Sequence, residues 1–201
     1  MENDKHKGGE QDENDEGVEQ LRQAPPRIYV ASLADYNDGR LHGAWLDVRG
    51  EPAELEEGVR AMLAASRVPG AEEWAIHDHE GFAPLRLGEH ESLERIARIG
   101  EGIARHGEAF KHWAAIDGIT RLDLVDGFDS AYRGHWQSVE AFAQDFWDDC
   151  AFDDTIAKVI PEQLQAYVRF DAQAFARDLE LSGDISSSPG DSGVYIFDGA
   201  G

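Results

Sequence analysis

Two histidines could begin a metal site. His77 and His79 alternate along an expected strand, so both imidazoles could point to one face, and Asp78 and Glu80 flank them. A metal site needs further ligands, and no third ligand is spaced nearby in the sequence. Polar side chains that face water at the end of a strand therefore explain these four residues better than a metal does.

Carboxylates are paired at Asp148 and Asp149 and again at Asp153 and Asp154. Such pairs can hold Mg²⁺ between substrate phosphates, but the chain lacks a second acidic pair on an obvious facing helix. A solvated helix end is therefore the preferred interpretation. Residues 35–39 resemble a calcium-binding loop, but the spacing is one residue short and no glutamate occupies the bidentate position. A turn is predicted there instead.

The sequence gives little support for nucleophilic catalysis or for a bound cofactor. The sequence contains no G-x-S-x-G elbow, and Cys150 lies among acidic residues, which suppress its thiolate form. Gly100 and Gly102 lack the third glycine of a dinucleotide-binding loop and follow a helix rather than a strand. The single cysteine excludes an internal disulfide and a cysteine-based zinc site. We therefore expect a protein that is not an enzyme and that has no cofactor or metal.

The composition is strongly acidic. The 201 residues include 41 acidic and 18 basic side chains, for a formal net charge of −23. A surface of this charge opposes binding to nucleic acid or to an anionic membrane. No apolar run approaches the roughly 20 residues of a spanning helix, and no signal peptide opens the chain. The expected protein is cytoplasmic, and its partners include neither nucleic acid nor a membrane.

Residues 1–26 have almost no apolar side chains and are expected to form a disordered acidic tail. The tail holds eight of the 41 acidic and three of the 18 basic residues, which leaves 33 acidic and 15 basic residues over 27–201. The folded part therefore has a net charge of −18 and is itself anionic.

Local patterns predict strands at 27–33, 40–48 and 73–78, around a helix that begins at Pro52. These elements form a small α/β domain. From Ser92 the pattern is helical, with a second helix around Phe110 to Ile116, although the glycines of this region weaken it. These glycines are Gly100, Gly102 and Gly107.

Ser138 is expected to cap a further helix. Shorter helices are predicted from Pro161 and from Asp171, and two strands follow them toward residue 198. The apolar side of the Ser138 helix includes Phe142, Phe146 and Trp147. The simpler interpretation places these rings in the core of their own domain. The sharper interpretation is that one or two of them reach a dimer seam.

Acidic residues gather without basic partners. Six of them lie between Gly134 and Ala157, a span that contains no lysine or arginine. Like charges at helical spacing repel each other, so a chain that needed only solubility could intersperse bases. We predict a distributed, partner-binding acidic surface, which comprises Glu51, Glu54, Glu57, Glu72, Glu73, Glu140, Asp145, Asp148, Asp149, Asp153 and Asp154.

The amount of charge is enough to imitate a segment of DNA. Duplex DNA carries one negative charge per ~1.7 Å of its axis. Two copies of residues 27–201 have a net charge of −36, which corresponds to about 60 Å of duplex, and their 66 carboxylates correspond to roughly 110 Å. The matching partner is a DNA-binding groove lined with lysine and arginine, which gains affinity for any properly spaced polyanion.

Long, ordered stretches of the sequence resemble the ArdA antirestriction proteins. They are IYVASLADYNDGRLHGAWLD at 28–47, PGAEEWAIHDHEGF at 69–82, AYRGHWQSVEAFAQDFWDD at 131–149 and FARDLELSGDI at 175–185. The resemblance implies a mimic of B-form DNA that occupies the DNA-binding site of type I restriction–modification enzymes, at their methyltransferase core. Such a protein protects an incoming mobile genetic element. The family's antirestriction motif falls near 136–153.

The resemblance also implies the architecture, an elongated α+β fold of three small domains that forms a homodimer. After the tail at 1–26, the expected domains are an antiparallel sheet plus helix over 27–90, a helical middle domain over 91–130, and helices plus a short sheet over 131–201, which carries the dimer interface. Two alternatives remain open. One is a highly acidic, salt-adapted soluble protein with no DNA-mimic role. The other is a divalent-metal-binding protein that uses His77, His79 or the acids of 145–154.

Overall fold

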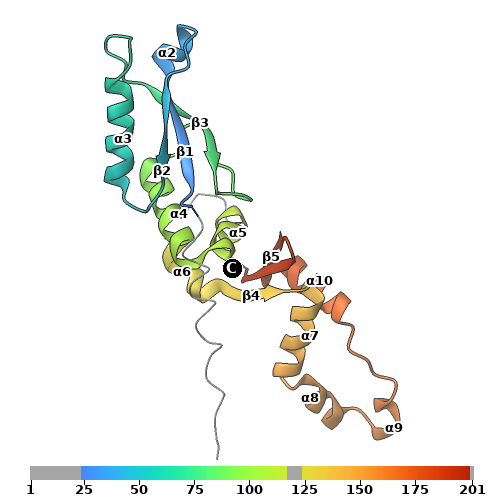
Figure 1. Ribbon diagram of the computed structural model, residues 1–201. Coiled ribbons are helices and arrows are strands. Elements are labelled where there is room, and N and C mark those ends of the chain that lie inside the picture. The colour runs from blue at the N-terminus through green and yellow to red at the C-terminus, as the bar shows by residue number, and fades with distance from the viewer. Residues whose placement is uncertain (1–23, 117–123, 200–201) are drawn as a thin grey trace, which may run out of the picture.

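The computed structural model describes residues 24–116 and 124–199. Within these residues the chain is elongated, with two small antiparallel sheets separated by helices (Figure 1). The α+β fold class is therefore confirmed. Residues 1–23, which make up most of the expected tail, lie outside the described residues. The boundaries of the three expected domains stay a prediction.

The first sheet has the strand order β2-β1-β3 and is antiparallel throughout. Its strands are β1 (Arg27–Ser32), β2 (Gly43–Asp47) and β3 (Trp74–Glu80). Helix α3 (Pro52–Ala64) lies along this sheet and buries Leu55, Val59 and Met62, which recur at helical spacing (Figure 1). The three predicted strands and the helix that begins at Pro52 are confirmed.

The turn predicted over 35–39 is wrong in part, because residues Leu33–Asn37 form a short helix, α2. The Ser32 hydroxyl caps α2 by accepting a hydrogen bond from the Asp35 amide at 3.3 Å. The Asp35 side chain is buried and accepts a hydrogen bond from the Ser66 hydroxyl at 2.5 Å, which lowers the pKa of Asp35. Residues that favour a turn act locally, so this pattern could not reveal that Asp35 has a hydrogen-bond partner 31 residues away.

Three helices connect the two sheets, namely α4 (Leu93–His106), α5 (Glu108–Ile116) and α6 (Leu124–Ala131). Two of the three glycines expected to weaken this region, Gly100 and Gly102, allow its elements to approach closely, whereas Gly107 ends α4 with a positive φ of 62°. A Cβ atom on Gly100 would lie 2.5 Å from Cγ1 of Val48, and one on Gly102 would collide with the ring of Phe110. Both glycines are buried, so their cost in helix propensity is offset by close packing.

The second sheet has the strand order β4-β6-β5. Strand β4 (Tyr132–Trp136) pairs with β6 (Gly193–Asp198), which pairs in turn with β5 (Ile185–Gly190). The two predicted C-terminal strands are confirmed. Strand β4 was not predicted, because its five residues adopt strand geometry by pairing with a strand near the other end of the described chain.

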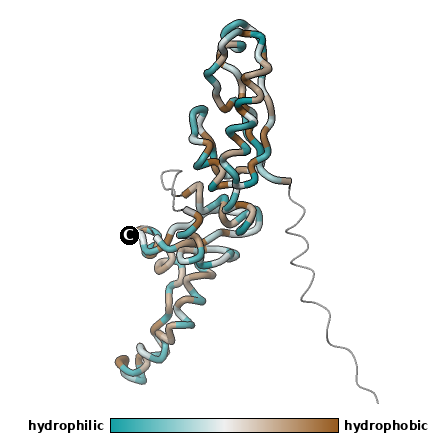
Figure 2. Tube along the Cα trace, turned by 90° about the vertical axis from the view of Figure 1, so that its left-hand side faces the viewer, coloured by the Kyte–Doolittle hydropathy of each residue, from teal (hydrophilic) through white to brown (hydrophobic). Residues whose placement is uncertain are grey.

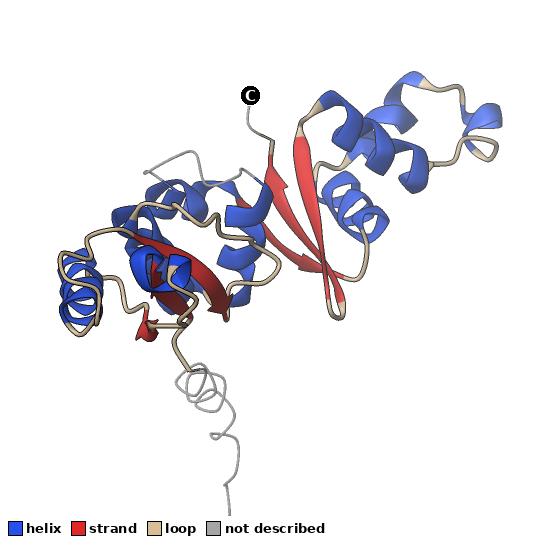
Figure 3. Cartoon of the chain, turned by 90° about the horizontal axis from the view of Figure 1, so that it is seen from above, coloured by secondary structure: helices blue, strands red, loops and turns tan. Residues whose placement is uncertain are grey.

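Four helices lie between β4 and β5, and together we call them the distal arm. They are α7 (Val139–Asp149), α8 (Phe152–Val159), α9 (Glu162–Gln165) and α10 (Ala172–Ser182). Figure 3 shows the arm at one end of the molecule and α3 at the other. Ser138 caps α7 as predicted, since its hydroxyl accepts a hydrogen bond from the Ala141 amide at 3.2 Å. Within the described residues, none of the helices combines the length and the apolar character needed to cross a membrane.

Most buried apolar side chains belong to one cluster, which runs from the first sheet through α4, α5 and α6 to Phe197 on β6. A smaller cluster of Phe142, Ile185 and Ile196 joins α7 to the second sheet. In α8 and α9 no residue is buried. The outer part of the arm therefore keeps exposed apolar surface, and Figure 2 shows hydrophobic stretches along it.

Candidate functional site

The two histidines of the possible metal site are held by different neighbours. His77 has no partner in the β1–β3 register, because a β-bulge interrupts the pairing there. Its ring meets Tyr36 edge-on at 5.1 Å, whereas the ring of His79 meets Phe82 at 5.8 Å. The bulge breaks the simple alternation that would point both imidazoles to one face. Across residues 24–116 and 124–199, no three His, Cys, Asp or Glu side chains are arranged to hold a metal ion.

Four of the five acids predicted in the first half of the chain lie on either side of the middle of α3, two near its start and two in the loop that follows it. Glu51 and Glu54 are at its N-terminus, where negative charge interacts favourably with the helix dipole. Glu72 and Glu73 lie beyond its C-terminus, in the loop that leads to β3. All four are exposed, and they are spread over the length of a 13-residue helix, about 20 Å. Glu57, also exposed, forms an ion pair with Arg60 one turn later.

The acids of α7 have a different setting. Glu140 lies in the first turn, where hydrogen bonds with Ser138 and with its own backbone amide lower its pKa. Asp145, Asp148 and Asp149 lie in the second half of the helix, whose last turn contains no basic residue. Negative charge near a helix C-terminus opposes the helix dipole, and acids three or four residues apart repel. This placement costs stability rather than adding to it.

Helix α8 places a second pair of acids close to the end of α7. Ala151 adopts a left-handed conformation, with φ of 49°, and lies between α7 and α8. Asp153 and Asp154 then occupy the first turn of α8. The indole N–H of Trp147 donates a hydrogen bond to Oδ1 of Asp153 at 2.9 Å. The sequence interpretation treated 148–154 as one helix end and missed both α8 and this contact.

We call the six acids of α7 and α8 the distal acidic surface: Glu140, Asp145, Asp148, Asp149, Asp153 and Asp154. All six are exposed. In the described part of the chain, no lysine or arginine nitrogen forms an ion pair with any of them within 4.0 Å. Their charge is therefore available to an external cation.

The three aromatic residues of the possible dimer seam differ in exposure. Phe142 is buried and meets Trp136 at 5.6 Å, so it belongs to the small core cluster beneath α7. Trp147 is half-buried and stacks on Phe170 at 3.9 Å. Phe146 is 40% exposed. The seam itself stays a prediction, and Phe146 offers it the most surface of the three.

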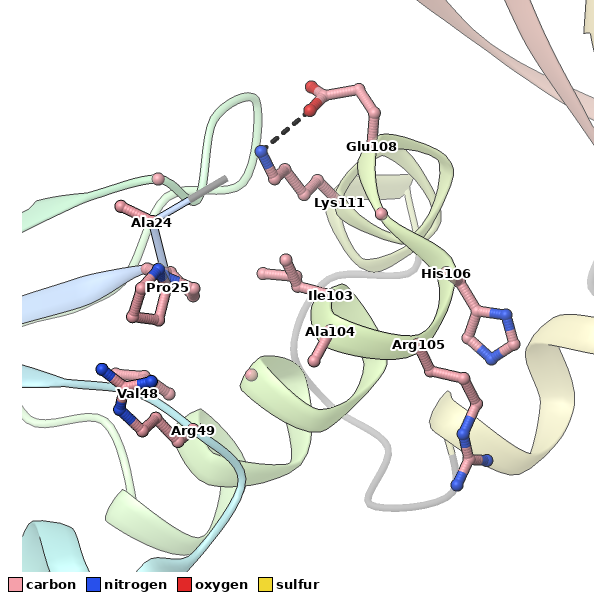
Figure 4. Close-up of a pocket in the computed structure, with 14 residues that line it drawn as sticks. Ala24, Pro25, Val48, Arg49, Ile103, Ala104, Arg105, His106, Glu108 and Lys111 are labelled. Atoms are coloured by element: carbon pink, nitrogen blue, oxygen red, sulfur yellow. Dashed lines mark hydrogen bonds and ion pairs between the residues drawn. The ribbon is translucent and has the colours of Figure 1, made fainter. Parts of the chain in front are cut away.

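A cavity of about 840 Å³ lies between the start of β1 and the junction of α4 and α5 (Figure 4). Apolar side chains such as Val48 and Ile103 line it, together with cationic residues that already have acidic partners. Nζ of Lys111 lies 2.8 Å from Glu108, and Nη2 of Arg49 lies 2.7 Å from Asp47. None of the predicted site residues lines this cavity, so the distal acidic surface is the stronger candidate.

These observations define the class of protein, an elongated acidic α+β protein whose candidate residues lie on exposed helices. The family model for antirestriction protein (ArdA) matches residues 28–192, so the chain belongs to the ArdA family of antirestriction proteins. The family consists of inhibitors rather than enzymes and implies interaction with restriction enzymes. A comparison with curated proteins finds no match to the chain.

Proposed function

We propose that this protein inhibits a type I restriction–modification enzyme in the cytoplasm by imitating B-form DNA in the DNA-binding site of the methyltransferase core. The inhibition protects an incoming mobile genetic element. The observation that carries this proposal is the distal acidic surface, where exposed carboxylates lack lysine or arginine partners among the described residues. Three of these acids, Asp145, Asp148 and Asp149, lie near the C-terminal end of α7, where negative charge works against helix stability, and this placement favours a role in binding.

The physical basis is the positive charge of a DNA-binding groove. Lysine and arginine side chains that contact phosphates release condensed ions when DNA binds, and they attract any polyanion with suitable spacing. Exposed carboxylates on two helices supply discrete negative charges of this kind. Because the charge is distributed, each acid contributes a small share of the affinity, comparable to an exposed ion pair.

The test is displacement of labelled DNA from a purified type I methyltransferase at two salt concentrations. We expect the wild-type protein to displace DNA and to lose affinity steeply as salt rises. The variant D145N/D149N should displace DNA roughly threefold to tenfold less well. The matched control D47N/E80Q removes two charges that have arginine partners, and it should retain more of the activity.

A salt-adapted protein would behave differently in the same experiment. It would fail to displace DNA at either salt concentration, and its stability would increase with salt. That result would contradict DNA mimicry. Calorimetric titration with Zn²⁺ and Mg²⁺ addresses the remaining alternative, because heat of binding at micromolar affinity would favour a metal-binding protein.

We further propose that the protein is a homodimer that associates through the distal arm. The arm exposes large apolar side chains, including Leu164 at 50%, Tyr167 at 83% and Leu181 at 78%. Burial of such side chains against a second copy is favourable, and a dimer doubles the length of the acidic surface.

Sedimentation velocity tests this association. L164S/Y167S should sediment as a monomer, because two apolar contacts are lost from the arm. L41S changes a residue with a similar exposure of 74% on the first half of the molecule, and it should remain dimeric. A wild-type protein that sediments as a monomer at micromolar concentration would contradict the proposal.

A further inference from the structure

We propose that Trp147 is a positioning residue that holds the Asp153 carboxylate in place for a cationic partner. The inference rests on the proposed function, because it concerns how the distal acidic surface presents its charges. Trp147 thus has a role in addition to packing within the arm. The partner chemistry is a guanidinium or ammonium group of the kind that lines a DNA-binding groove.

The Trp147 indole is fixed by rings from three separate segments. It stacks on Phe170 with centroids 3.9 Å apart and planes 19° apart. Phe152, in the first turn of α8, lies 4.8 Å away, and Phe175 of α10 meets the indole edge-on at 6.1 Å. These contacts join α7, α8 and α10 in the part of the arm where few residues are fully buried. The direction of the indole N–H is therefore determined by packing.

That N–H points at one carboxylate of the distal acidic surface. Nε1 of Trp147 lies 2.9 Å from Oδ1 of Asp153, and Asp153 is exposed. An indole has a single donor, so one oxygen of the carboxylate is engaged while the other can accept from a cation. The contact also links the end of α7 to the start of α8 across the left-handed residue Ala151. It holds the two pairs of acids in a defined relation.

A carboxylate that is already oriented loses less conformational freedom when it binds. Asp148 is held in a similar way, because Nε2 of Gln144 donates to its Oδ1 at 2.9 Å. The junction of α7 and α8 thus presents two oriented carboxylates, Asp148 from α7 and Asp153 from α8. Trp147 differs from Gln144 in that its own position is set by stacking on rings of other segments.

The experiment is a double-mutant cycle in the DNA-displacement assay, using the full chain. W147F keeps an aromatic ring but removes the donor, and D153N removes the charge. We expect W147F to reduce affinity for the methyltransferase roughly twofold to fivefold. In the D153N background the same change should have almost no further effect, because Trp147 acts through Asp153.

Trp136 supplies a matched control. Its indole N–H donates to the backbone carbonyl of Arg133 at 3.0 Å rather than to an acid. W136F therefore makes the same chemical change without touching a carboxylate, and any effect on displacement should be equal in the wild-type and D153N backgrounds. Circular dichroism and thermal unfolding of each variant monitor folding separately from binding.

A second readout is independent of the methyltransferase. The Trp147 indole proton should exchange with solvent faster in D153N than in the wild type, and the Trp136 indole proton should not change. An unchanged Trp147 exchange rate would show that the hydrogen bond has no role, and the proposal would be overturned.

The outcomes separate this inference from the proposed function. If W147F weakens binding equally in the wild-type and D153N backgrounds, Trp147 acts through the fold and the inference fails. If W147F has no effect while D145N/D149N loses affinity, the inference fails and the proposed function stands. If the wild-type protein does not displace DNA, the proposed function itself fails.

Discussion

In the residues described before β4, exposed carboxylates often lie beside arginines, whereas those on α7 and α8 of the distal arm do not. Arg27 and Glu80 approach to 2.7 Å, and Arg40 and Asp38 to 2.8 Å. The six acids of the distal acidic surface have no lysine or arginine within 4.0 Å in the described chain. Acids with partners are locally neutralised, so a cationic surface can use the unpaired acids, which are the six of the arm together with exposed acids around α3 such as Glu51, Glu54, Glu72 and Glu73.

The two regions also differ in how they are held together. The first half contains the large buried cluster, with Ile28, Phe110 and Ile96 fully inaccessible. In the arm, α7 buries Phe142 and Ala143 and α10 buries Ala176, while α8 and α9 bury nothing. Most of the buried apolar contacts that stabilise the fold therefore lie in the first half, whereas the arm has exposed acidic and apolar side chains. Matched substitutions in the two regions can test this division.

The largest expected effect comes from removing a core ring. Phe110→Ala should lower the free energy of unfolding by about 3–5 kcal/mol, because the ring is fully buried and its loss leaves a cavity. Phe146→Ala in the arm should lower it by about 1 kcal/mol or less, since that ring is 40% exposed. Urea unfolding measures both. Similar losses for the two variants would contradict the division.

A pH-dependent effect is expected where helix α5 meets the second sheet. His112 of α5 is buried, its Nδ1 lies 2.7 Å from Oγ of Ser188 on β5, and its ring stacks on Tyr195 of β6 at 4.3 Å. Burial lowers the pKa of His112, and nearby Glu108 offsets this only in part.

The unfolded chain therefore takes up a proton near pH 6.5 while the folded chain does not, so stability falls as the pH drops below 6.5. The contribution is limited to about 1.4 kcal/mol per pH unit for one proton. Urea unfolding at pH 5.0, 6.0 and 7.5 should show a shallower fall for His112→Gln than for the wild type. His90→Gln, at an exposed histidine, should behave like the wild type.

A smaller effect is expected at the helix caps. Ser138→Ala should lower the free energy of unfolding by about 1 kcal/mol, because the Ser138 hydroxyl accepts a hydrogen bond from the Ala141 amide. Ser92 occupies the same position before α4, but its side chain forms no capping hydrogen bond. Ser92→Ala should therefore change stability by less than the Ser138 variant in the same urea experiment. Equal losses would show that the observed cap geometry does not decide the energetics.

The smallest effect concerns a single charge in each region. Asp149→Asn removes a negative charge from the end of α7 and should raise stability by a few tenths of a kcal/mol. Asp47→Asn removes the partner of Arg49 and should lower stability by a similar amount. Thermal unfolding at low salt measures both signs. A loss of stability in Asp149→Asn would mean that this acid has a stabilising partner.

The sequence predicted those parts of the fold that depend on neighbouring residues. Pro52 and Ser138 each marked the start of a helix, and the strands β1, β2, β3 and β6 followed from their apolar patterns. Strand β4 and helix α8 were missed, because β4 depends on pairing with β6 and α8 is separated from α7 by the left-handed residue Ala151. Helix propensity alone makes Gly100 and Gly102 unfavourable in α4. The close approach of Val48 and of Phe110 explains why these two positions have no side chain.

The acidic character, the lack of bases around α7 and the resemblance to a family come from composition and order, so the sequence alone determined them. The ion pairs between distant segments were decided only in three dimensions: Arg27 and Glu80 are 53 residues apart, and Arg133 and Asp198 are 65 apart. The same holds for Trp147, whose ring contacts come from α8, from Phe170 and from α10. Hydrogen-bonded caps, periodic patterns and local ion pairs act within a few residues, whereas burial and long-range ion pairs depend on which distant segments the fold brings together.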